Sequence, residues 1–136
     1  MVSRMKTFAM ALDLVDEPRS IDQYREYHRN VWPEVKDGLL EIGILGMEIY
    51  LLGDRLFMVL NTEDDFDLIR DFQKYTDSSE KAAEWDLLMR KFQKKTPFTS
   101  EDDWWAPMQK VFDLNSCRGL HGNHRFTSPL MGFKSF

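Results

Sequence analysis

The stretch MEIYLLGDRLFMVLN (residues 47–61) consists of two mostly apolar runs on either side of Gly53 and Asp54. A glycine and an aspartate between two such runs are typical of a two-residue hairpin turn, because both tolerate the backbone angles that this turn requires. We therefore predict antiparallel strands over residues 47–52 and 55–61. Side chains alternate across a strand, so the apolar row of the first strand and the row that carries its glutamate face opposite ways.

Upstream of the hairpin, the sequence predicts a strand and a long helix. Residues 7–14 (TFAMALDL) are mostly apolar in both rows, which is typical of a strand covered on two faces. Apolar residues at three- and four-residue spacing follow over residues 20–42 and indicate an amphipathic helix. Ser20, with a glutamine three residues later, matches a capping box. Pro33 should divide this helix, with Trp32 at the joint, since a residue before proline avoids helical angles.

Downstream of the hairpin, two more helices and a last strand are expected. Residues 62–65 (TEDD) could cap a helix that runs to about Lys74, and residues 78–95 carry apolar side chains on one helical face. A fourth strand is expected from about Met108 to residue 115. The order β-α-β-β-α-β is the split βαβ pattern, which indicates an α+β, ferredoxin-like fold.

The predicted strands carry few charged residues on either face. Helices should cover one face of such a sheet and leave the other face exposed to water. A second copy of the chain, packed sheet against sheet, is the simplest cover for that face. We therefore expect a homodimer.

Length and charge limit the classes of function. The chain of 136 residues fits one domain, which we place at residues 1–115, with a C-terminal tail over residues 116–136. A net charge of −5 and a pI near 5.2 argue against nucleic acid and give no reason to expect a membrane partner. One cysteine cannot form an internal disulfide, so we expect a reducing compartment, the cytoplasm.

One group of candidate site residues lies on the predicted helix. Tyr24, His28 and Trp32 are four residues apart and would line one side of it. An imidazole changes protonation near neutral pH, so His28 could transfer a proton, while Tyr24 could position a hydroxyl-bearing ligand and Trp32 could stack on a sugar ring. The alternative is structural, because His28 shares a stripe with Val31 and Val35 and a buried histidine is usually a hydrogen-bonded core residue.

Other candidates lie on the strands and among the later tryptophans. Glu48 shares a strand row with Tyr50, and a carboxylate in a covered sheet needs a partner or a ligand. Trp85 has the spacing of a core residue. Trp104 and Trp105 are adjacent, so one points inward while the other can touch a ligand or a second subunit. We take Tyr50 and Trp105 as ligand contacts.

Four segments, taken together, resemble the L-rhamnose mutarotase family. They are QYREYHRNVWPEV (23–35), MEIYLLGDRLFMVL (47–60), EWDLLM (84–89) and WWAPMQKVFDL (104–114). The match follows chain order across about residues 6–115, and Y-x-x-x-H-x-x-x-W-P-E is its most specific part. The resemblance implies a dimeric α/β barrel of ferredoxin-like subunits.

The same resemblance implies an activity, which is cofactor-free interconversion of the α and β anomers of a 6-deoxy-L-hexose, L-rhamnose or L-fucose. It implies that His28 is the catalytic acid, Tyr24 a sugar-binding residue and Trp85 the first of a substrate-contacting pair. Asp86 stands where the family tends to carry a second tryptophan, and Met47 where it tends to carry a tyrosine. These departures leave the sugar open, although the hairpin segment looks more like the L-fucose branch.

The reaction sets the groups that the site must supply. Ring opening takes a proton from the anomeric hydroxyl and delivers one to the ring oxygen, and closure reverses both steps. His28 can supply the acid, and Glu48, Glu34 or a held water the base. Met47 or Met58 could form an apolar wall for the 6-methyl group.

Two other functions remain open from the sequence. A haem-binding or quinol-type monooxygenase of the same dimeric architecture would use His28 as an iron ligand or turn it toward an aromatic substrate. A non-catalytic sugar-binding module would bind the monosaccharide without accelerating anomer exchange. Cys117, His121 and His124 form too weak a zinc pattern, and we predict no metal site.

Overall fold

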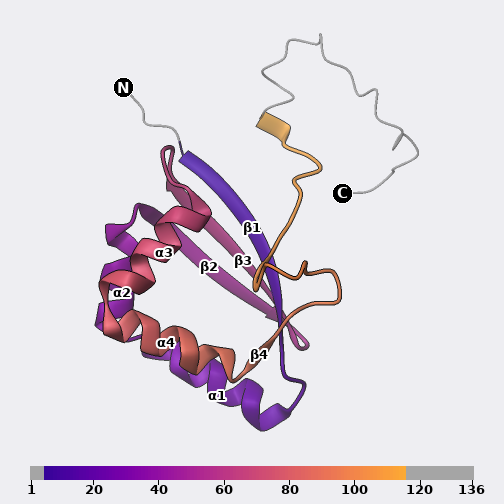
Figure 1. The fold of residues 1–136 in the computed structure, drawn as a ribbon. Coiled ribbons are helices and arrows are strands. Elements are labelled where there is room, and N and C mark those ends of the chain that lie inside the picture. Colours follow the sequence, from indigo (N-terminus) through magenta and orange to yellow (C-terminus); the bar gives the residue numbers. More distant parts are fainter. Residues whose placement is uncertain (1–4, 116–136) are drawn as a thin grey trace, which may run out of the picture.

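The computed structural model describes residues 5–115, which form an antiparallel sheet with helices on one face (Figure 1). The elements in chain order are β1 (Met5–Leu14), α1 (Pro18–Arg29), α2 (Pro33–Glu41), β2 (Ile44–Leu52), β3 (Arg55–Glu63), α3 (Leu68–Ser78), α4 (Glu80–Arg90), β4 (Gln93–Lys94) and β5 (Ala106–Pro107). The strand order is β2-β3-β1-β4, and β5 also pairs with β1. The α+β class is therefore confirmed. The predicted tail, including Cys117, His121 and His124, lies outside the described residues.

The predicted hairpin is present and organises the sheet. β2 and β3 pair antiparallel from Leu52 opposite Arg55, and the turn residue Gly53 has a φ of +62°. Glycine adopts this left-handed angle without the strain that a Cβ would bring. β3 pairs on its other side with β1, where Leu12 lies opposite Leu56. β1 and β3 are thus the two long central strands of the sheet on which the helices pack.

The predicted break at Pro33 is confirmed, whereas the predicted helix start at Ser20 is wrong. α1 begins at Pro18, and Glu17 is its N-cap residue without a side-chain hydrogen bond. Proline favours the first helical position because its fixed φ suits a helix and its missing N–H would have no partner there. α1 ends at Arg29, and Trp32 precedes α2 with an extended ψ of 137°.

The third helix begins later than predicted. Residues 62–63 complete β3, so they cannot start a helix. Asp67 is the N-cap residue instead, and its carboxylate accepts a hydrogen bond of 2.8 Å from the Arg70 backbone N–H. Several acidic residues in a row make the cap ambiguous in the sequence, because each can accept this bond.

The helix predicted over residues 78–95 is too long, and the strand predicted from Met108 is misplaced. α4 ends at Arg90, and β4 follows it and pairs with the end of β1. The last strand is β5, and residues 108–113 contain no strand. Directly after β5, the Met108 N–H donates a hydrogen bond of 2.8 Å to the carbonyl of Ala9 in β1. Short strands beside a helix bury similar residues, so hydrophobic spacing alone does not separate them.

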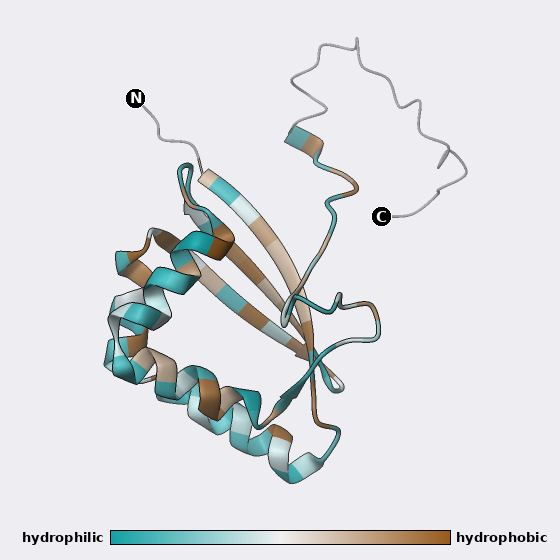
Figure 2. Ribbon diagram, viewed as in Figure 1, coloured by the Kyte–Doolittle hydropathy of each residue, from teal (hydrophilic) through white to brown (hydrophobic). Residues whose placement is uncertain are grey.

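The hydrophobic core lies between the helices and one face of the sheet. Figure 2 shows apolar residues along the strands, whereas the helices are mostly polar with apolar patches. One buried cluster gathers around Tyr24, Trp85 and Met89, and a second gathers around Leu60 and Phe66. The partly buried Trp105 packs against both clusters.

The opposite face of the sheet, which we call the open face, carries Tyr50, Leu52, Phe57 and Val59. Tyr50 is 53% exposed and Leu52 is 75% exposed. Alternation places these residues opposite the helix-facing row of β2 and β3. The expected homodimer would bury this face, and that remains a prediction. No helix among residues 5–115 is long and apolar enough to cross a membrane.

Candidate active site

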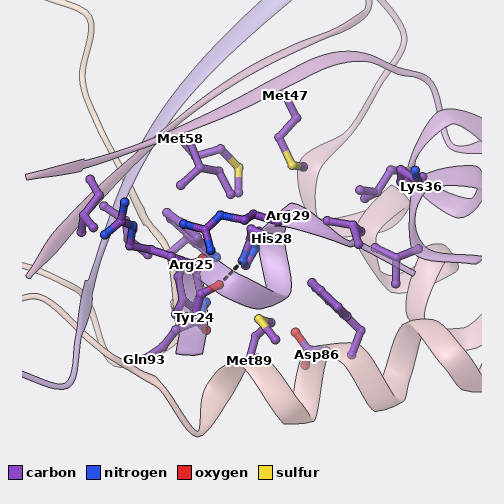
Figure 3. Close-up of a pocket in the computed structure, with 18 of the residues that line it drawn as sticks. Tyr24, Arg25, His28, Arg29, Lys36, Met47, Met58, Asp86, Met89 and Gln93 are labelled. Carbon is purple, nitrogen blue, oxygen red and sulfur yellow. Dashed lines mark hydrogen bonds between the residues drawn. The ribbon is translucent and has the colours of Figure 1, made fainter. Parts of the chain in front are cut away.

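A cavity of about 670 Å³ lies between the helices and the sheet (Figure 3). Its lining includes Tyr24 and His28 of α1, Trp85 of α4, and Met47 and Met58 of the hairpin. The volume suits a small ligand such as a monosaccharide. The same cavity is therefore lined by the apolar side chains of the methionines and the tryptophan and by the polar rings of His28 and Tyr24.

His28 is held by the helix that carries it. Its Nδ1 lies 2.9 Å from the Tyr24 backbone carbonyl oxygen, which can only accept a hydrogen bond. Nδ1 must therefore carry the hydrogen, and in the neutral ring Nε2 has the lone pair. Burial lowers the pKa of His28 below its usual 6.5, although the bond to the Tyr24 carbonyl opposes this shift. The imidazole is thus neutral at pH 7, with Nε2 as a proton acceptor.

Tyr24 packs directly against this imidazole. Their ring centroids are 4.3 Å apart, and Tyr24 is only 4% exposed. Burial raises the pKa of Tyr24 to about 12, which a hydrogen bond from Gln93 partly offsets. Tyr24 is therefore a neutral phenol at pH 7 and can act as a hydrogen-bond donor.

The predicted tryptophans form one side of the site in two layers. The Trp85 ring lies 5.5 Å from the His28 ring, edge to face, and lines the cavity. Trp32 packs behind it, with ring centroids 5.1 Å apart, and does not line this cavity. Trp105 also lines the cavity. Trp32 thus contacts a lining residue and fixes the orientation of Trp85.

The structure brings five of the predicted site residues to one cavity and leaves two others on the open face. Tyr24, His28, Met47, Trp85 and Trp105 line the cavity. The two on the open face are Glu48 and Tyr50, which alternate with Met47 along β2. The Tyr50 hydroxyl donates to the Glu48 carboxylate at 3.1 Å, and that bond raises the pKa of Tyr50.

Charged and polar groups missing from the predicted site also line the cavity. They are Arg25, Arg29, Lys36, Asp86 and Gln93. Asp86 accepts a hydrogen bond of 3.1 Å from Arg90 one turn along α4. The sequence shows Asp86 as a departure from the family pattern. It gives no signal for Gln93, because the spacing of apolar residues predicts a helix there and the residue lies in β4. Among residues 5–115, no three His, Cys, Asp or Glu side chains converge as metal ligands.

A cavity lined by a neutral imidazole, a phenol and an indole on an α+β sheet fits an enzyme that acts on a small molecule. The sequence model of the L-rhamnose mutarotase family matches residues 7–114, and the chain belongs to this family. The family consists of carbohydrate isomerases, so the prediction of an aldose mutarotase is confirmed at that level.

The chain is also similar to individual proteins. A UPF0734 protein of Dictyostelium discoideum is 50% identical over 113 residues, which cover 81% of this chain and 90% of the relative. An L-fucose mutarotase of Xanthomonas campestris is 34% identical, covering 82% and 90%. The crystal structure of an L-rhamnose mutarotase from Formosa agariphila matches with a TM-score of 0.57 at 20% identity, covering 79% of this chain and 97% of that one. This last likeness supports the fold.

Proposed function

We propose that the chain interconverts the α and β anomers of a 6-deoxy-L-hexose, L-fucose or L-rhamnose, in the cavity around His28. The observation that carries the proposal is the neutral His28 at this cavity, with Nδ1 engaged by the Tyr24 carbonyl and Nε2 left as a base. One relative named above is an L-fucose mutarotase, and the matching family is named for L-rhamnose. Both sugars carry an apolar 6-methyl group, which suits the methionines of the hairpin.

His28 can move both protons of the reaction. Nε2 takes the proton of the anomeric hydroxyl while the bond between C1 and the ring oxygen breaks. The imidazolium then returns this proton to the ring oxygen, which yields the open aldehyde. Rotation about the C1–C2 bond and the reverse steps close the ring to the other anomer. Because both oxygens were bonded to the same carbon, one imidazole suffices, and no carboxylate base is required at the cavity.

Other lining residues would hold the sugar. We assign the Tyr24 hydroxyl as a hydrogen-bond donor to a sugar oxygen and the Trp85 ring as a surface for the apolar face of the sugar. Met47 and Met58 would contact the 6-methyl group. Asp86, held by Arg90, would accept a hydrogen bond from a sugar hydroxyl.

The open face suggests the assembly. A second copy packed on Tyr50, Leu52, Phe57 and Val59 would bury apolar surface that the single chain exposes or only partly covers. We therefore propose a homodimer of two sheets, a dimeric α/β barrel. In it, Glu48 and Tyr50 would be interface residues. We further propose the cytoplasm as the setting of the enzyme.

The test is saturation-transfer NMR on L-fucose and L-rhamnose at anomeric equilibrium. Wild type should transfer saturation between the anomeric protons well above the enzyme-free sugar. His28→Asn should reduce this excess by about 10²–10⁴-fold, the range that general acid–base catalysis supplies. Asparagine can still donate to the Tyr24 carbonyl, so the helix should remain folded.

The outcomes separate the alternatives. Sugar that binds to wild type without faster exchange would mean a binding module. No binding and no exchange for either sugar would overturn the mutarotase proposal. Equal exchange in wild type and in a folded His28→Asn variant would remove His28 from the mechanism.

A further inference from the structure

A buried glutamine connects Tyr24 to a tryptophan outside the cavity lining. Gln93 is the first residue of β4 and is 8% exposed. Its Oε1 accepts a hydrogen bond of 2.8 Å from Trp104 Nε1. Gln93 and Tyr24 line the same cavity and lie next to each other in Figure 3. A side-chain contact with Gln93 also opposes the rise in the pKa of Tyr24.

The donor and acceptor roles in this connection follow from the groups themselves. An indole N–H can only donate, so it must meet the oxygen of the Gln93 amide and not the nitrogen. This contact fixes the orientation of the amide. The Gln93 nitrogen, which carries only donors, is then the atom that faces Tyr24. The Tyr24 oxygen is therefore the acceptor in this contact, and its own proton points elsewhere.

Trp104 is itself held in place. The Arg90 guanidinium lies over the Trp104 ring, 4.6 Å from its centroid, and Arg90 also donates to Asp86. Cation–π contact and ion pairing together restrict the rotation of the indole. A defined donor therefore sits behind Gln93, supported by the same helix that lines the cavity.

We propose that Gln93, oriented by Trp104, is a positioning residue that commits the Tyr24 hydroxyl to donate its proton to an oxygen of the bound sugar. This inference rests on the proposed function, because the sugar is the expected acceptor. Tyr24 stacks on His28, so the oxygen that it holds lies close to the proton-transferring imidazole. The substrate must therefore present a lone pair, not a hydroxyl proton, to Tyr24.

The decisive variant is Gln93→Glu, which has nearly the same shape. Its ionised carboxylate still accepts from Trp104 but cannot donate to Tyr24, and it accepts a hydrogen bond from the Tyr24 hydroxyl instead. We expect the KM for the sugar to rise roughly tenfold, the equivalent of one neutral hydrogen bond, with a smaller fall in kcat. Gln93→Met is the matched control that removes both bonds and leaves the Tyr24 proton available to the sugar, so its KM should rise less.

A double-variant cycle distinguishes positioning from a structural effect. In a Tyr24→Phe background, Gln93→Glu should raise KM no further, since no hydroxyl remains to be oriented. Equal effects of Gln93→Glu with and without the hydroxyl would overturn the proposal, as would an unchanged KM in a folded single variant. Circular dichroism melting identifies variants that fail to fold.

A second measurement reads the hydrogen bonds without sugar. In ¹H–¹⁵N NMR spectra, Tyr24→Phe should shift a Gln93 side-chain amide proton upfield and leave the Trp104 indole proton in place. A shift of the indole proton alone would overturn the inferred orientation.

If wild type shows no anomer exchange, the proposed function fails and the role toward sugar fails with it. If wild type is active and Gln93→Glu is equally active, only the positioning role fails.

Discussion

The two faces of the β2–β3 hairpin share one backbone but have different surroundings. On the helix face, Leu60 is fully buried and Met58 is 6% exposed at the cavity. On the open face, Tyr50 and Leu52 are more than half exposed. The difference comes from the helices, which pack on one side only (Figure 1).

Adjacent residues of a strand therefore lie on opposite faces of the sheet, even where both are candidate site residues. Met47 and Glu48 are neighbours, yet one lines the cavity and the other lies on the open face with Tyr50. A one-residue step moves a side chain to the other side of the sheet. Nearness in sequence therefore does not place two strand residues in one site.

The largest expected effect is on stability and contrasts two adjacent residues of β3. Leu60→Ala should lower the free energy of unfolding by about 2–5 kcal/mol, because it leaves a cavity in the core. Val59→Ala, on the open face, should cost much less in the monomeric state. Urea denaturation of both variants at low protein concentration measures the difference. Similar losses for the two variants would mean that both faces are equally buried.

The next effect concerns assembly. Val59→Asp places a charge in the middle of the open face and should convert the expected dimer to a monomer, because the charge would be buried without a partner. Ile69→Asp is the matched control, since Ile69 is 83% exposed on α3. Sedimentation velocity gives the oligomeric state. A wild-type monomer at micromolar concentration would show that no second copy covers this face.

A smaller effect is expected from pH. Burial lowers the pKa of His28 below 6.5, and the neutral ring is the base. Enzymatic exchange should therefore be level above pH 6.5 and fall as pH drops through the lowered pKa. The unfolded chain binds more protons in this interval, so the His28 contribution to stability is full above pH 6.5 and declines as pH falls. Exchange rates and the NMR titration of the His28 ring should give the same midpoint, and a midpoint above 6.5 would contradict the assigned burial effect.

The smallest expected effect is on kcat/KM and compares a carboxylate at the cavity, Asp86, with one on the open face, Glu48. Asp86→Asn should lower kcat/KM by about three- to tenfold, since Asp86 lines the cavity but is partly exposed and shared with Arg90. Glu48→Gln should leave kcat/KM unchanged. A large loss of kcat/KM in a Glu48→Gln variant that is still a stable dimer would indicate that Glu48 is the general base.

Much of the fold was predictable because it depends on local signals. The hairpin follows from Gly53 and Asp54 between apolar runs, and the helix break follows from the ring of Pro33. The helix ends were less predictable. α1 starts at Pro18, and Glu17 makes no side-chain cap bond that the sequence could signal. Asp67 follows several acidic residues that could cap α3 equally well.

Part of the site was also predictable. Tyr24 and His28 are one turn apart on α1, so helical geometry alone brings them together. Met47 and Trp85 could be assigned by resemblance to the family. Gln93 could not, because its contacts with Tyr24 and Trp104 join residues distant in the chain and depend on where α4 ends.

The sequence by itself determined the α+β class, the hairpin, the divided helix and the family, because turn chemistry, hydrophobic spacing and motif order are local properties of the chain. Only the tertiary structure decided which face of the sheet is covered, and hence that Met47 belongs to the cavity and Glu48 does not. It also decided the protonation of His28 and the orientation of Gln93. Those properties depend on burial and on hydrogen bonds between distant residues, and neither exists until the helices pack on the sheet.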